Sequence, residues 1–478
     1  MDTKKLRQKI LDLAIRGKLV PQDPNDEPAS VLLERIRAEK ERLIAEGKIK
    51  RPKKSKTSSA ESHYQQLPEG WSSAKLGDLF LICSAKRIMK SDWCSAGIPF
   101  YRTREIVKLH ECGSVDNDLF ISKEYFNRIK HDFGVPKTND IMLTAVGTIG
   151  IPYIVKEDDC FYYKDASVLC LRNFYKLNSK FFFFLILSSE LREQMFSASK
   201  GTTVDTVTIE KANDYIFMLP PLKEQERIVN VIESYLSIIN DLESNLQYLH
   251  DCVSITKSKI LDLAMRGKLV PQDPADEPAA DMLRRINHKA KIIGDNPHYP
   301  QLPSGWCIAT INDVFEINPK NKANGDMEAG FVPMTSICDG FNNSFVHTPR
   351  KWDEIKNGFT HFADGDIAVA KISPCLENRK SMILKNLPNG IGSGTTELLV
   401  FRSKVIYQEY GLLFFKSDNF IKQCVGTFNG VVGQQRVSKN IVEEIPIPIP
   451  PYKAQMKIAN EVNRLFETLD QINSNLAN

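Results

Sequence analysis

The sequence ILDLAIRGKLVPQDP at residues 10–24 returns as ILDLAMRGKLVPQDP at residues 260–274. Over the longer stretches 9–29 and 259–279, 19 of 21 positions are identical at an offset of 250. A repeat of this length sets the architecture before local structure is considered, because one structural unit is then expected to occur twice. We call this stretch the repeated phrase.

Two further matches follow the phrase in each half of the chain. HYQQLPEGW at residues 63–71 matches HYPQLPSGW at 298–306 with an offset of 235. MLPPLKEQ at 218–225 matches PIPPYKAQ at 448–455 with an offset of 230. Between these two matches the halves diverge, and only faint similarity remains. The pattern indicates one scaffold that is kept the same and two inserts, at about 72–217 and 307–447, that are kept different.

Apolar residues after LPPLKEQ alternate at spacings of four and three, which predicts a coiled-coil seam along one helix. The positions are Ile228, Ile232, Tyr235, Ile239, Leu242, Leu246, Leu249, Val253, Thr256, Ile260 and Leu263. Such a helix would be roughly 54 Å long and end near Gly267, a plausible C-cap.

The two chain ends carry the two halves of the same seam. Ile458, Val462, Leu465, Leu469, Ile472 and Leu476 repeat its first half, and Leu6, Ile10 and Leu13 repeat its second half. The chain is therefore a circularly permuted repeat. We expect its two ends to meet and rebuild a second long helix, antiparallel to the first about a pseudo-twofold axis.

Each repeated phrase ends in a polar turn, PQDPNDEPAS or PQDPADEPAA, followed by a short helix. Asp26 or Glu27 is expected to cap this helix, with Pro28 near its first position. Because a core role would not fix the sequence of a polar turn, the repeat indicates a surface that docks a partner. The candidate docking residues are Arg16, Lys18, Asp23, Arg266, Lys268 and Asp273.

The composition is that of a soluble globular protein with two to four domains, because 42% of the 478 residues are apolar and the net charge is only +4. The longest apolar run, FFFFLIL, is too short to span a membrane, and no signal-peptide pattern is present. Ten scattered cysteines without a CxxC predict reduced thiols, mostly in cores, and a cytoplasmic location. KIKRPKKSK at 48–56 is interpreted as a solvated basic linker.

Both inserts are predicted to be mixed strands and loops with one short apolar helix, so the fold class is α+β. The strand-like runs are IPFYRTREIV (98–107), DIMLTAV (140–146), SVLCLRNF (167–174), DIAVAKI (366–372) and ELLVF (397–401). The expected domains are an N-terminal scaffold helix, turn and basic linker (1–62), a first recognition domain (63–221), a central long helix with turn and short helix (222–297), a second recognition domain (298–449) and a C-terminal scaffold helix (450–478).

Motifs of catalysis are missing from the sequence. It contains no FxGxG-type cofactor loop, no [DNS]PP[YF] quartet, no GKS/T loop and no HExxH, and the histidines show no metal-ligand spacing. We therefore expect no catalytic residue, no metal and no cofactor in this chain.

The inserts do contain side chains suited to contacting DNA. Arg matches guanine, Asn and Gln match adenine, and Lys and Thr hold phosphates. The candidates are Lys86, Arg87, Lys90, Arg102, Thr103, Arg104, Thr144 and Thr148 in the first insert, and Lys320, Asn321, Lys322, Lys371, Asn378, Arg379, Gln434, Gln435 and Arg436 in the second.

Together these motifs resemble the specificity subunit of Type I restriction–modification systems. The carriers are LPxGW before each insert, LPPLKEQ and IPPYKAQ before the helices, and the duplicated LDLAxRGKLVPQDPxDEPA. The resemblance covers essentially the whole chain. The sequence departs from the family pattern at Ala145 and Val146, where many relatives carry Arg and Ser, and at KAQ in place of KEQ.

The resemblance implies a bacterial or archaeal DNA-recognition subunit without chemistry of its own. Each insert would be a target recognition domain that reads half of a bipartite, asymmetric site. The helices would set the spacing and dock two methyltransferase subunits, and restriction subunits would join them. S-adenosylmethionine, ATP and Mg would then belong to the partners.

Two other readings stay open at this point. One is an adaptor that binds only proteins, and the other is a restriction or methylation enzyme fused to its recognition domain.

Overall fold

The computed structural model describes residues 2–49, 68–197, 205–294, 296–427 and 435–477. The chain divides into two compact units, Asp2–Ser244 and Asn245–Asn478, called here the N-terminal and C-terminal units. Helix α9 (Leu222–Met265), 44 residues long, contributes its first half to one unit and its second half to the other. Within the described residues, no helix is both long and apolar enough to cross a membrane.

The N-terminal unit contains α1 (Thr3–Ile15), α2 (Ala29–Ala45), β1 (Ser72–Lys75), α3 (Leu76–Leu79), β2 (Leu81–Ser84), η1 (Lys90–Asp92), β3 (Ile98–Tyr101), α4 (Thr103–Cys112), β4 (Phe120–Ile121), α5 (Lys123–Asp132), β5 (Ile141–Thr144), β6 (Pro152–Ile154), β7 (Tyr162–Tyr163), β8 (Val168–Arg172), α6 (Ser179–Leu187), α7 (Ser189–Ser197), α8 (Ile209–Asp214) and β9 (Ile216–Leu219).

The C-terminal unit contains α10 (Ala279–Ile286), β10 (Cys307–Thr310), α11 (Ile311–Val314), β11 (Glu316–Ile317), β12 (Glu328–Val332), η2 (Met334–Ser336), β13 (Thr348–Lys351), α12 (Trp352–Ile355), β14 (Thr360–Ala363), β15 (Ile367–Ala370), β16 (Ser381–Ile383), η3 (Pro388–Gly390), β17 (Ile391–Gly394), β18 (Leu398–Arg402), α13 (Gln408–Phe415), α14 (Asp418–Val425), α15 (Lys439–Glu443), β19 (Pro446–Ile449) and α16 (Tyr452–Ala477).

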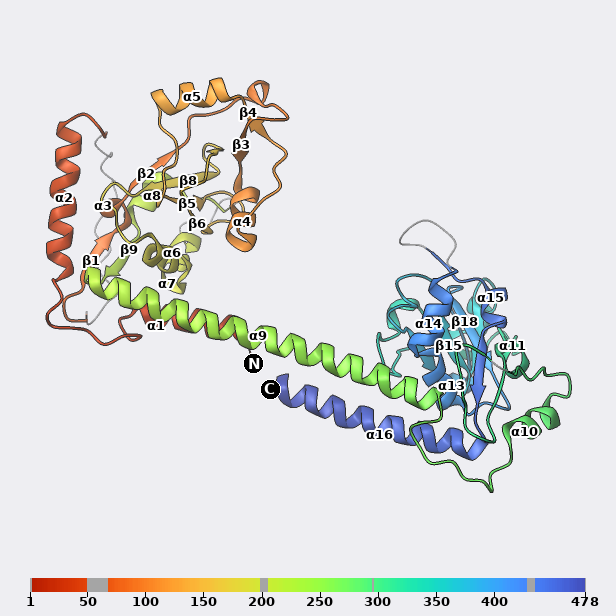
Figure 1. Cartoon of the computed structure of the whole chain (residues 1–478). Helices are drawn as coiled ribbons and strands as arrows, with labels where there is room; N and C mark the ends of the chain where they lie inside the picture. Colours follow the sequence, from red (N-terminus) through yellow and green to blue (C-terminus); the bar gives the residue numbers. More distant parts are fainter. Residues whose placement is uncertain (1, 50–67, 198–204, 295, 428–434, 478) are drawn as a thin grey trace. The chain divides into compact units, whose positions relative to one another are not determined.

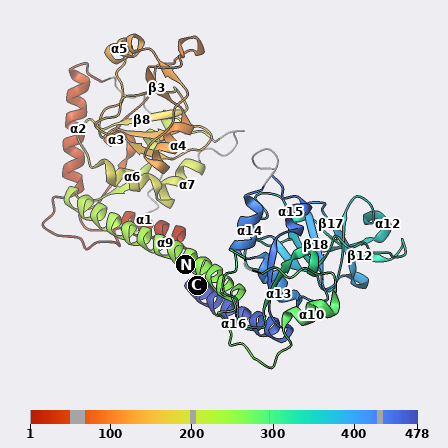
Figure 2. The same ribbon diagram turned by 45° about the vertical axis from the view of Figure 1, so that its right-hand side comes forward.

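The two inserts share the strand order of one sheet although their sequences have diverged. An antiparallel sheet has the order β2-β8-β5-β6 in one unit and β11-β18-β15-β16 in the other. A second sheet contains a parallel pair in both units, β3 with β7 and β12 with β17. Each insert contains the predicted short apolar helix, α6 or α13, and this helix packs on the first sheet (Figure 2). The structure therefore confirms an α+β fold with two mixed domains on a helical scaffold.

Each insert starts and finishes on a two-stranded ribbon. Strand β1 pairs antiparallel with β9, and β10 pairs in the same way with β19. In each unit the ribbon lies directly before a scaffold helix, α9 or α16 (Figure 1). The two ends of an insert are consequently neighbours, although more than a hundred residues separate them in the chain.

Helix α1 is shorter than α9 and runs antiparallel to the first half of α9 within the N-terminal unit. The Arg7 guanidinium on α1 donates to Asn240 Oδ1 at 2.6 Å. In the C-terminal unit, Lys257 Nζ on α9 donates to Asp470 Oδ1 on α16 at 2.6 Å. The offsets of 250 and 230 make these two contacts equivalent, so each unit is one copy of the repeat. That the chain ends meet about a twofold axis stays a prediction.

The apolar seam of α9 is buried in two separate stretches. Ile228, Ile232 and Ile239 are buried in the N-terminal unit, although Tyr235 between them is exposed, and Val253 is buried in the C-terminal unit. Between them the side chains at 242 and 249 are exposed. The predicted helix is confirmed, but within each unit its seam is covered only as far as α1 or α16 extends.

Three local predictions were wrong. Pro28 occupies the N-cap position of α2, and Asp26 does not cap that helix because it pairs with Arg227. The strand predicted at 98–107 ends at Tyr101 and is followed by α4, because the Glu105 side chain caps the Arg102 backbone N–H three residues earlier. The cysteines are free as predicted, but only three of the ten are buried.

Candidate nucleic-acid interface and docking surface

The three repeated stretches meet in each unit at a contact that we call the interlock. Gly17 has a φ of +64°, and a Cβ placed there would lie 2.6 Å from Pro68 Cγ and 3.2 Å from the Trp71 ring. The equivalent Gly267 has a φ of +67°, and its Cβ would lie 2.4 Å from Pro303 Cγ. Only glycine fits both the left-handed backbone and the close approach. The RGK turn of the phrase therefore packs directly on LPxGW.

A buried tryptophan joins the third stretch to the interlock. Trp71 Nε1 donates to Glu224 Oε2 at 3.0 Å, and Gln22 Nε2 donates to Glu224 Oε1 at 3.1 Å. Burial raises the pKa of the Glu224 carboxyl. In the C-terminal unit Ala454 replaces the glutamate, and Trp306 Nε1 donates to Gln272 Oε1 at 2.7 Å instead. The departure from KEQ to KAQ is thus compensated by a glutamine of the repeated phrase.

The polar turn of the phrase also contacts the start of the following helix. In the N-terminal unit, Arg227 donates to the buried Asp26 at 2.6 Å. In the C-terminal unit, Lys453 lies 3.9 Å from Asp276. Intramolecular packing consequently accounts for part of the sequence identity of the two polar turns, in addition to the predicted docking of a partner.

The predicted docking residues surround the interlock. Arg16, Lys18, Asp23, Lys268 and Asp273 are exposed, and Arg266 is half-buried. The two aspartates accept backbone N–H groups two residues ahead, at 2.9 and 3.0 Å, so both also shape their turns.

Arg266 lines an open groove between α9 and α14 in the C-terminal unit. The groove has a volume of about 530 Å³, and Lys259, His298 and Lys422 line it as well. Asp262 accepts from Arg266 Nε at 2.8 Å, which orients the guanidinium along α9.

Three loops meet at the end of the main sheet in both units, and we call this meeting point the three-loop junction. In the N-terminal unit Ala145 N donates to Ser167 O at 2.9 Å, and Val207 N donates to Ala145 O at 2.8 Å. In the C-terminal unit Lys371 N donates to Glu397 O at 2.9 Å, and Val437 N donates to Lys371 O at 3.0 Å. A third backbone hydrogen bond is also equivalent in the two units. Gly147 N donates to Asp205 O, and Ser373 N donates to Gln435 O. One backbone frame therefore carries two different sets of side chains.

The junction brings several candidate DNA residues together. In the C-terminal unit it unites Lys371, Gln435 and Arg436, and Arg436 Nε lies 2.9 Å from a Glu397 carboxylate oxygen. In the N-terminal unit Thr148 is exposed beside it. Thr103 Oγ1 joins it by donating to Val146 O at 3.3 Å or to Ser167 O at 3.2 Å. Gln434 lies outside the described residues.

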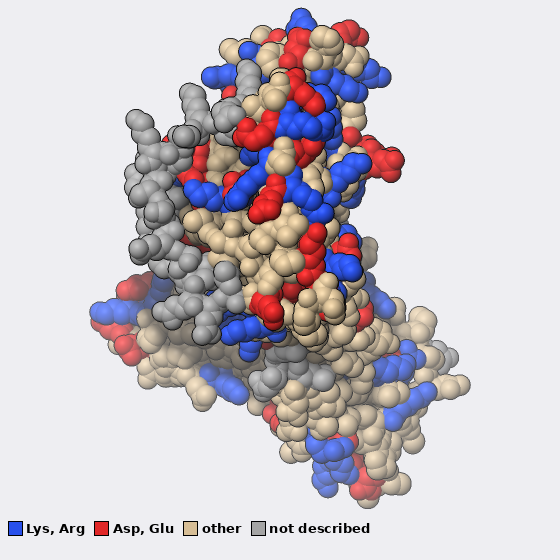
Figure 3. All heavy atoms as spheres, turned by 90° about the vertical axis from the view of Figure 1, so that its left-hand side faces the viewer, with Lys and Arg blue, Asp and Glu red and all other residues tan. Residues whose placement is uncertain are grey.

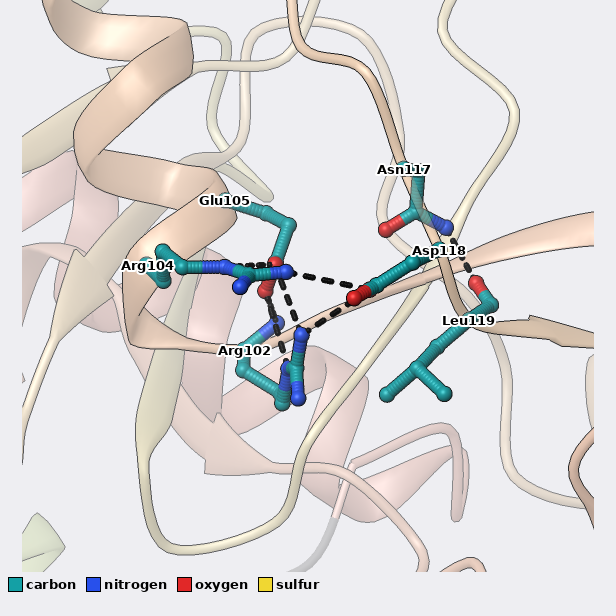
Figure 4. Close-up of polar contacts among 6 residues, drawn as sticks. All are labelled: Arg102, Arg104, Glu105, Asn117, Asp118 and Leu119. Carbon is teal, nitrogen blue, oxygen red and sulfur yellow. Dashed lines mark hydrogen bonds and ion pairs between the residues drawn. The ribbon is translucent and has the colours of Figure 1, made fainter. Parts of the chain in front are cut away.

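Two candidate arginines of the first insert form a cluster with two carboxylates (Figure 4). Arg102 and Arg104 both donate to the fully buried Glu105, at 3.0 and 2.7 Å. Both also donate to the exposed Asp118, at 3.1 and 3.0 Å. Burial opposes ionisation of Glu105, but the arginine hydrogen bonds outweigh it and lower its pKa. The cluster holds two guanidinium groups in fixed orientations at the start of α4.

Other candidates lie apart or point inward. Lys86, Arg87, Lys90, Lys320, Lys322 and Asn378 are exposed on loops or at the start of η1. Thr144 is fully buried, and its hydroxyl accepts from Ile151 N, so it does not fit the prediction that it contacts DNA. Asn321 Nδ2 donates to Phe362 O at 2.7 Å. Arg379 donates to Lys416 O, Ser258 Oγ and Asp418, which ties its loop to α9 and α14.

Sequence reasoning missed the carboxylates that orient these arginines, namely Glu105, Asp118 and Glu397. The spacing of Glu105 three residues after Arg102, which is typical of a capping box, is a signal that could have revealed the first of them. On the face shown in Figure 3, basic and acidic side chains are interspersed. Arg102, Arg104 and Arg436 are each paired with carboxylates.

The comparison with protein families decides the assignment. The family model described as "Type I restriction modification DNA specificity domain" matches residues 68–248 and 303–478, one match for each unit. The chain belongs to this family.

Two curated relatives come from Escherichia coli. The EcoAI specificity subunit is 44% identical and the EcoEI specificity subunit 42% identical, each over 231 residues, or 45% of this chain. The alignments span 39% of each relative, about two-fifths of its length. A solved chain, from a study of assembly and conformational transition of the type I R-M system, matches with a TM-score of 0.55. It is 16% identical and covers 87% of this chain and 94% of its own length, which supports the fold.

Proposed function

We propose that this chain is the DNA sequence-specificity subunit of a Type I restriction–modification complex and carries no catalytic site of its own. Each recognition domain reads one half of a bipartite, asymmetric site on double-stranded DNA. The helical scaffold sets the spacing of the two halves and docks two methyltransferase subunits. Restriction subunits complete the assembly, which acts on DNA in the cytoplasm.

One observation carries this proposal: the three-loop junction has the same backbone hydrogen bonds in both units but different side chains. A frame of this kind can present base-reading groups in one orientation and still select different bases. In the C-terminal unit it presents Lys371, Gln435 and Arg436. In the N-terminal unit the nearby Arg102 and Arg104 are held by carboxylates.

Cofactor chemistry falls to the partners in this proposal. The methyltransferase subunits would bind S-adenosylmethionine and methylate adenine, and the restriction subunits would use ATP and Mg. The specificity-domain match and the names of the curated relatives support this division of labour.

The test maps methylated adenines in cells that carry the complete system with wild-type chain, without the chain, or with Gln435→Ala and Arg436→Ala together. We expect removal of the chain to abolish one bipartite methylation motif. The double variant should relax or change only the half of the motif that the C-terminal unit reads. Lys439→Ala on α15, which removes a nearby cation outside the junction, should leave the motif unchanged. A double variant with an unaltered motif and full methylation would contradict the assignment of the junction.

The two alternative readings have distinct signatures. Methyl transfer by the purified chain alone would show a fused enzyme. An adaptor that binds only proteins would leave the complex without the steep salt dependence of DNA binding that phosphate contacts produce.

A further inference from the structure

Two cysteines of the N-terminal unit lie directly opposite each other on neighbouring strands. Cys83 on β2 is the register partner of Cys170 on β8 in the antiparallel main sheet. Side chains at such positions point to the same face, with Cα atoms about 4.5–5.5 Å apart, which lies within the range that a disulfide spans. The Cys83 thiol already points toward β8, since its Sγ lies 3.6 Å from the Cys170 carbonyl oxygen. All ten cysteines lie in described residues, and this is the one pair at facing strand positions.

The surroundings give the two thiols different roles. Cys83 is partly exposed, whereas Cys170 is buried. A hydrogen bond from Cys170 and the nearby Arg172 guanidinium lower the pKa of the Cys83 thiol to about 7, against the effects of burial and of Asp140. Tyr163 also donates toward Cys83. The interaction with Cys83 and burial raise the pKa of Cys170. We assign Cys83 as the nucleophile, because a small disulfide in solution can reach this partly exposed thiol and not the buried Cys170.

We propose that Cys83 and Cys170 form a reversible disulfide when the chain meets an oxidised small thiol such as glutathione disulfide. The Cys83 thiolate attacks one sulfur of the small disulfide, and the first small thiolate leaves and takes up a proton. Cys170 then loses its proton and attacks the Cys83 sulfur, which releases the second small thiol. In sum, two cysteine thiols are oxidised to one cystine and one small disulfide is reduced to two thiols.

The crosslink would act on an edge strand. Among the described residues, β2 pairs only with β8 within the main sheet, and the candidate DNA residues Lys86, Arg87 and Lys90 follow β2 directly. The Lys86 backbone N–H donates to the Tyr162 hydroxyl at 2.8 Å, which ties this segment to β7. A covalent bond at Cys83 therefore fixes the strand that leads into these residues.

In the experiment, the reduced full-length chain is treated with glutathione disulfide near neutral pH. It is then digested under non-reducing conditions, and the disulfide-linked peptides are identified by mass spectrometry. We expect one crosslinked peptide pair containing Cys83 and Cys170, a fall from ten free thiols to eight, and full reversal by dithiothreitol. Cys160→Ser, which changes an exposed cysteine, should still form the crosslink. Circular dichroism verifies that each variant is folded.

Two variants separate the roles. Cys170→Ala should stop at a glutathione adduct on Cys83, and Cys83→Ser should form neither adduct nor crosslink on this pair. Oxidation confined to exposed cysteines such as Cys112 and Cys160 in the wild-type chain would overturn the proposal, and so would a Cys83 adduct in the wild-type chain that never resolves to Cys170. These measurements do not depend on DNA recognition. Their outcome is therefore independent of whether the proposed function is correct.

Discussion

Glu224 and Ala454 occupy the same position in the two interlocks, yet only the glutamate can accept a side-chain hydrogen bond. The repeated glutamine makes up the difference, since Gln272 accepts from Trp306 where Gln22 donates to Glu224. The two halves of the chain therefore provide different hydrogen-bond acceptors for the same tryptophan indole N–H.

This comparison predicts the behaviour of the N-terminal interlock. In Glu224→Ala the Gln22 amide can turn and accept from Trp71, so the free energy of unfolding should fall by less than about 1 kcal/mol. Combining it with Gln22→Ala leaves the indole N–H unpaired in a buried residue, which should cost about 1–3 kcal/mol. Denaturant titration followed by circular dichroism measures both. A single variant as unstable as the double variant would contradict the exchange of acceptors.

A second prediction concerns the arginine cluster. Asp118→Asn removes the exposed carboxylate from Arg102 and Arg104 while Glu105 still holds both. We expect the assembled complex to bind DNA more tightly, with a steeper dependence on salt concentration, because two guanidinium groups become available to phosphates. Asp116→Asn is the control, since it makes the same change of charge two residues away on the same loop. Equal effects of both variants would show that only net charge matters.

At the scale of residues, the sequence predicts the chemistry of a side chain but not its position in the fold. Arg102, Arg104, Lys371 and Arg436 were named because of their chemistry, and the structure places them near loops that meet. Thr144 and Arg379 were named by the same rule, yet one is buried and the other is tied to three internal partners. Residue type is readable from sequence, whereas burial and internal partners depend on contacts between distant segments.

At the scale of elements, helices were more predictable than strands. The alternating apolar seam predicts helix α9 correctly, because its periodicity extends over many turns. The composition of 98–107 predicts one strand, because a short run of apolar and aromatic residues suits either state. The capping box of Arg102 and Glu105 decides in favour of a helix after Tyr101. The inserts could be aligned only faintly, although their sheets have the same order.

The glycines of the interlock yield a prediction at this scale. Gly17→Ala and Gly267→Ala should each destabilise their own unit by more than about 2 kcal/mol, because left-handed strain adds to a collision with a proline ring. Gly47→Ala is the control: its φ is +69°, but its Cβ would meet nothing within 4 Å. It should therefore show only the strain, about 1–2 kcal/mol. Thermal unfolding measures the difference, and equal losses would argue against the collision.

At the scale of the whole molecule, the single helix α9 contributes residues to both units, and the proposed spacing role depends on this helix. Inserting four residues near Leu242 lengthens the helix by about 6 Å, so the unread spacer of the DNA site should grow by about one or two base pairs. Mapping of methylated adenines reads the new motif. An unchanged motif together with intact DNA binding would reject the helix as a ruler.

The repeated docking surface gives the last prediction. Arg16→Ala combined with Arg266→Ala should weaken binding of methyltransferase subunits at least tenfold, or about 1.4 kcal/mol, while unfolding stays unchanged. Sedimentation with purified subunits measures the assembly. Arg35→Ala with Arg285→Ala is the control, because these arginines also occupy equivalent positions of the repeat, and both are exposed and paired with glutamates. Unchanged assembly in the first pair would place docking elsewhere.

The two-stranded ribbons at the base of the inserts have a consequence for how such genes change. Because β1 lies beside β9, and β10 beside β19, an insert enters and leaves its unit at a single place. Gene conversion or crossing-over within the DNA that encodes the repeated flanking stretches could exchange a whole insert without altering the helices around it. A lineage could then acquire a new half-specificity in one genetic event, with no intermediate in which the scaffold is broken.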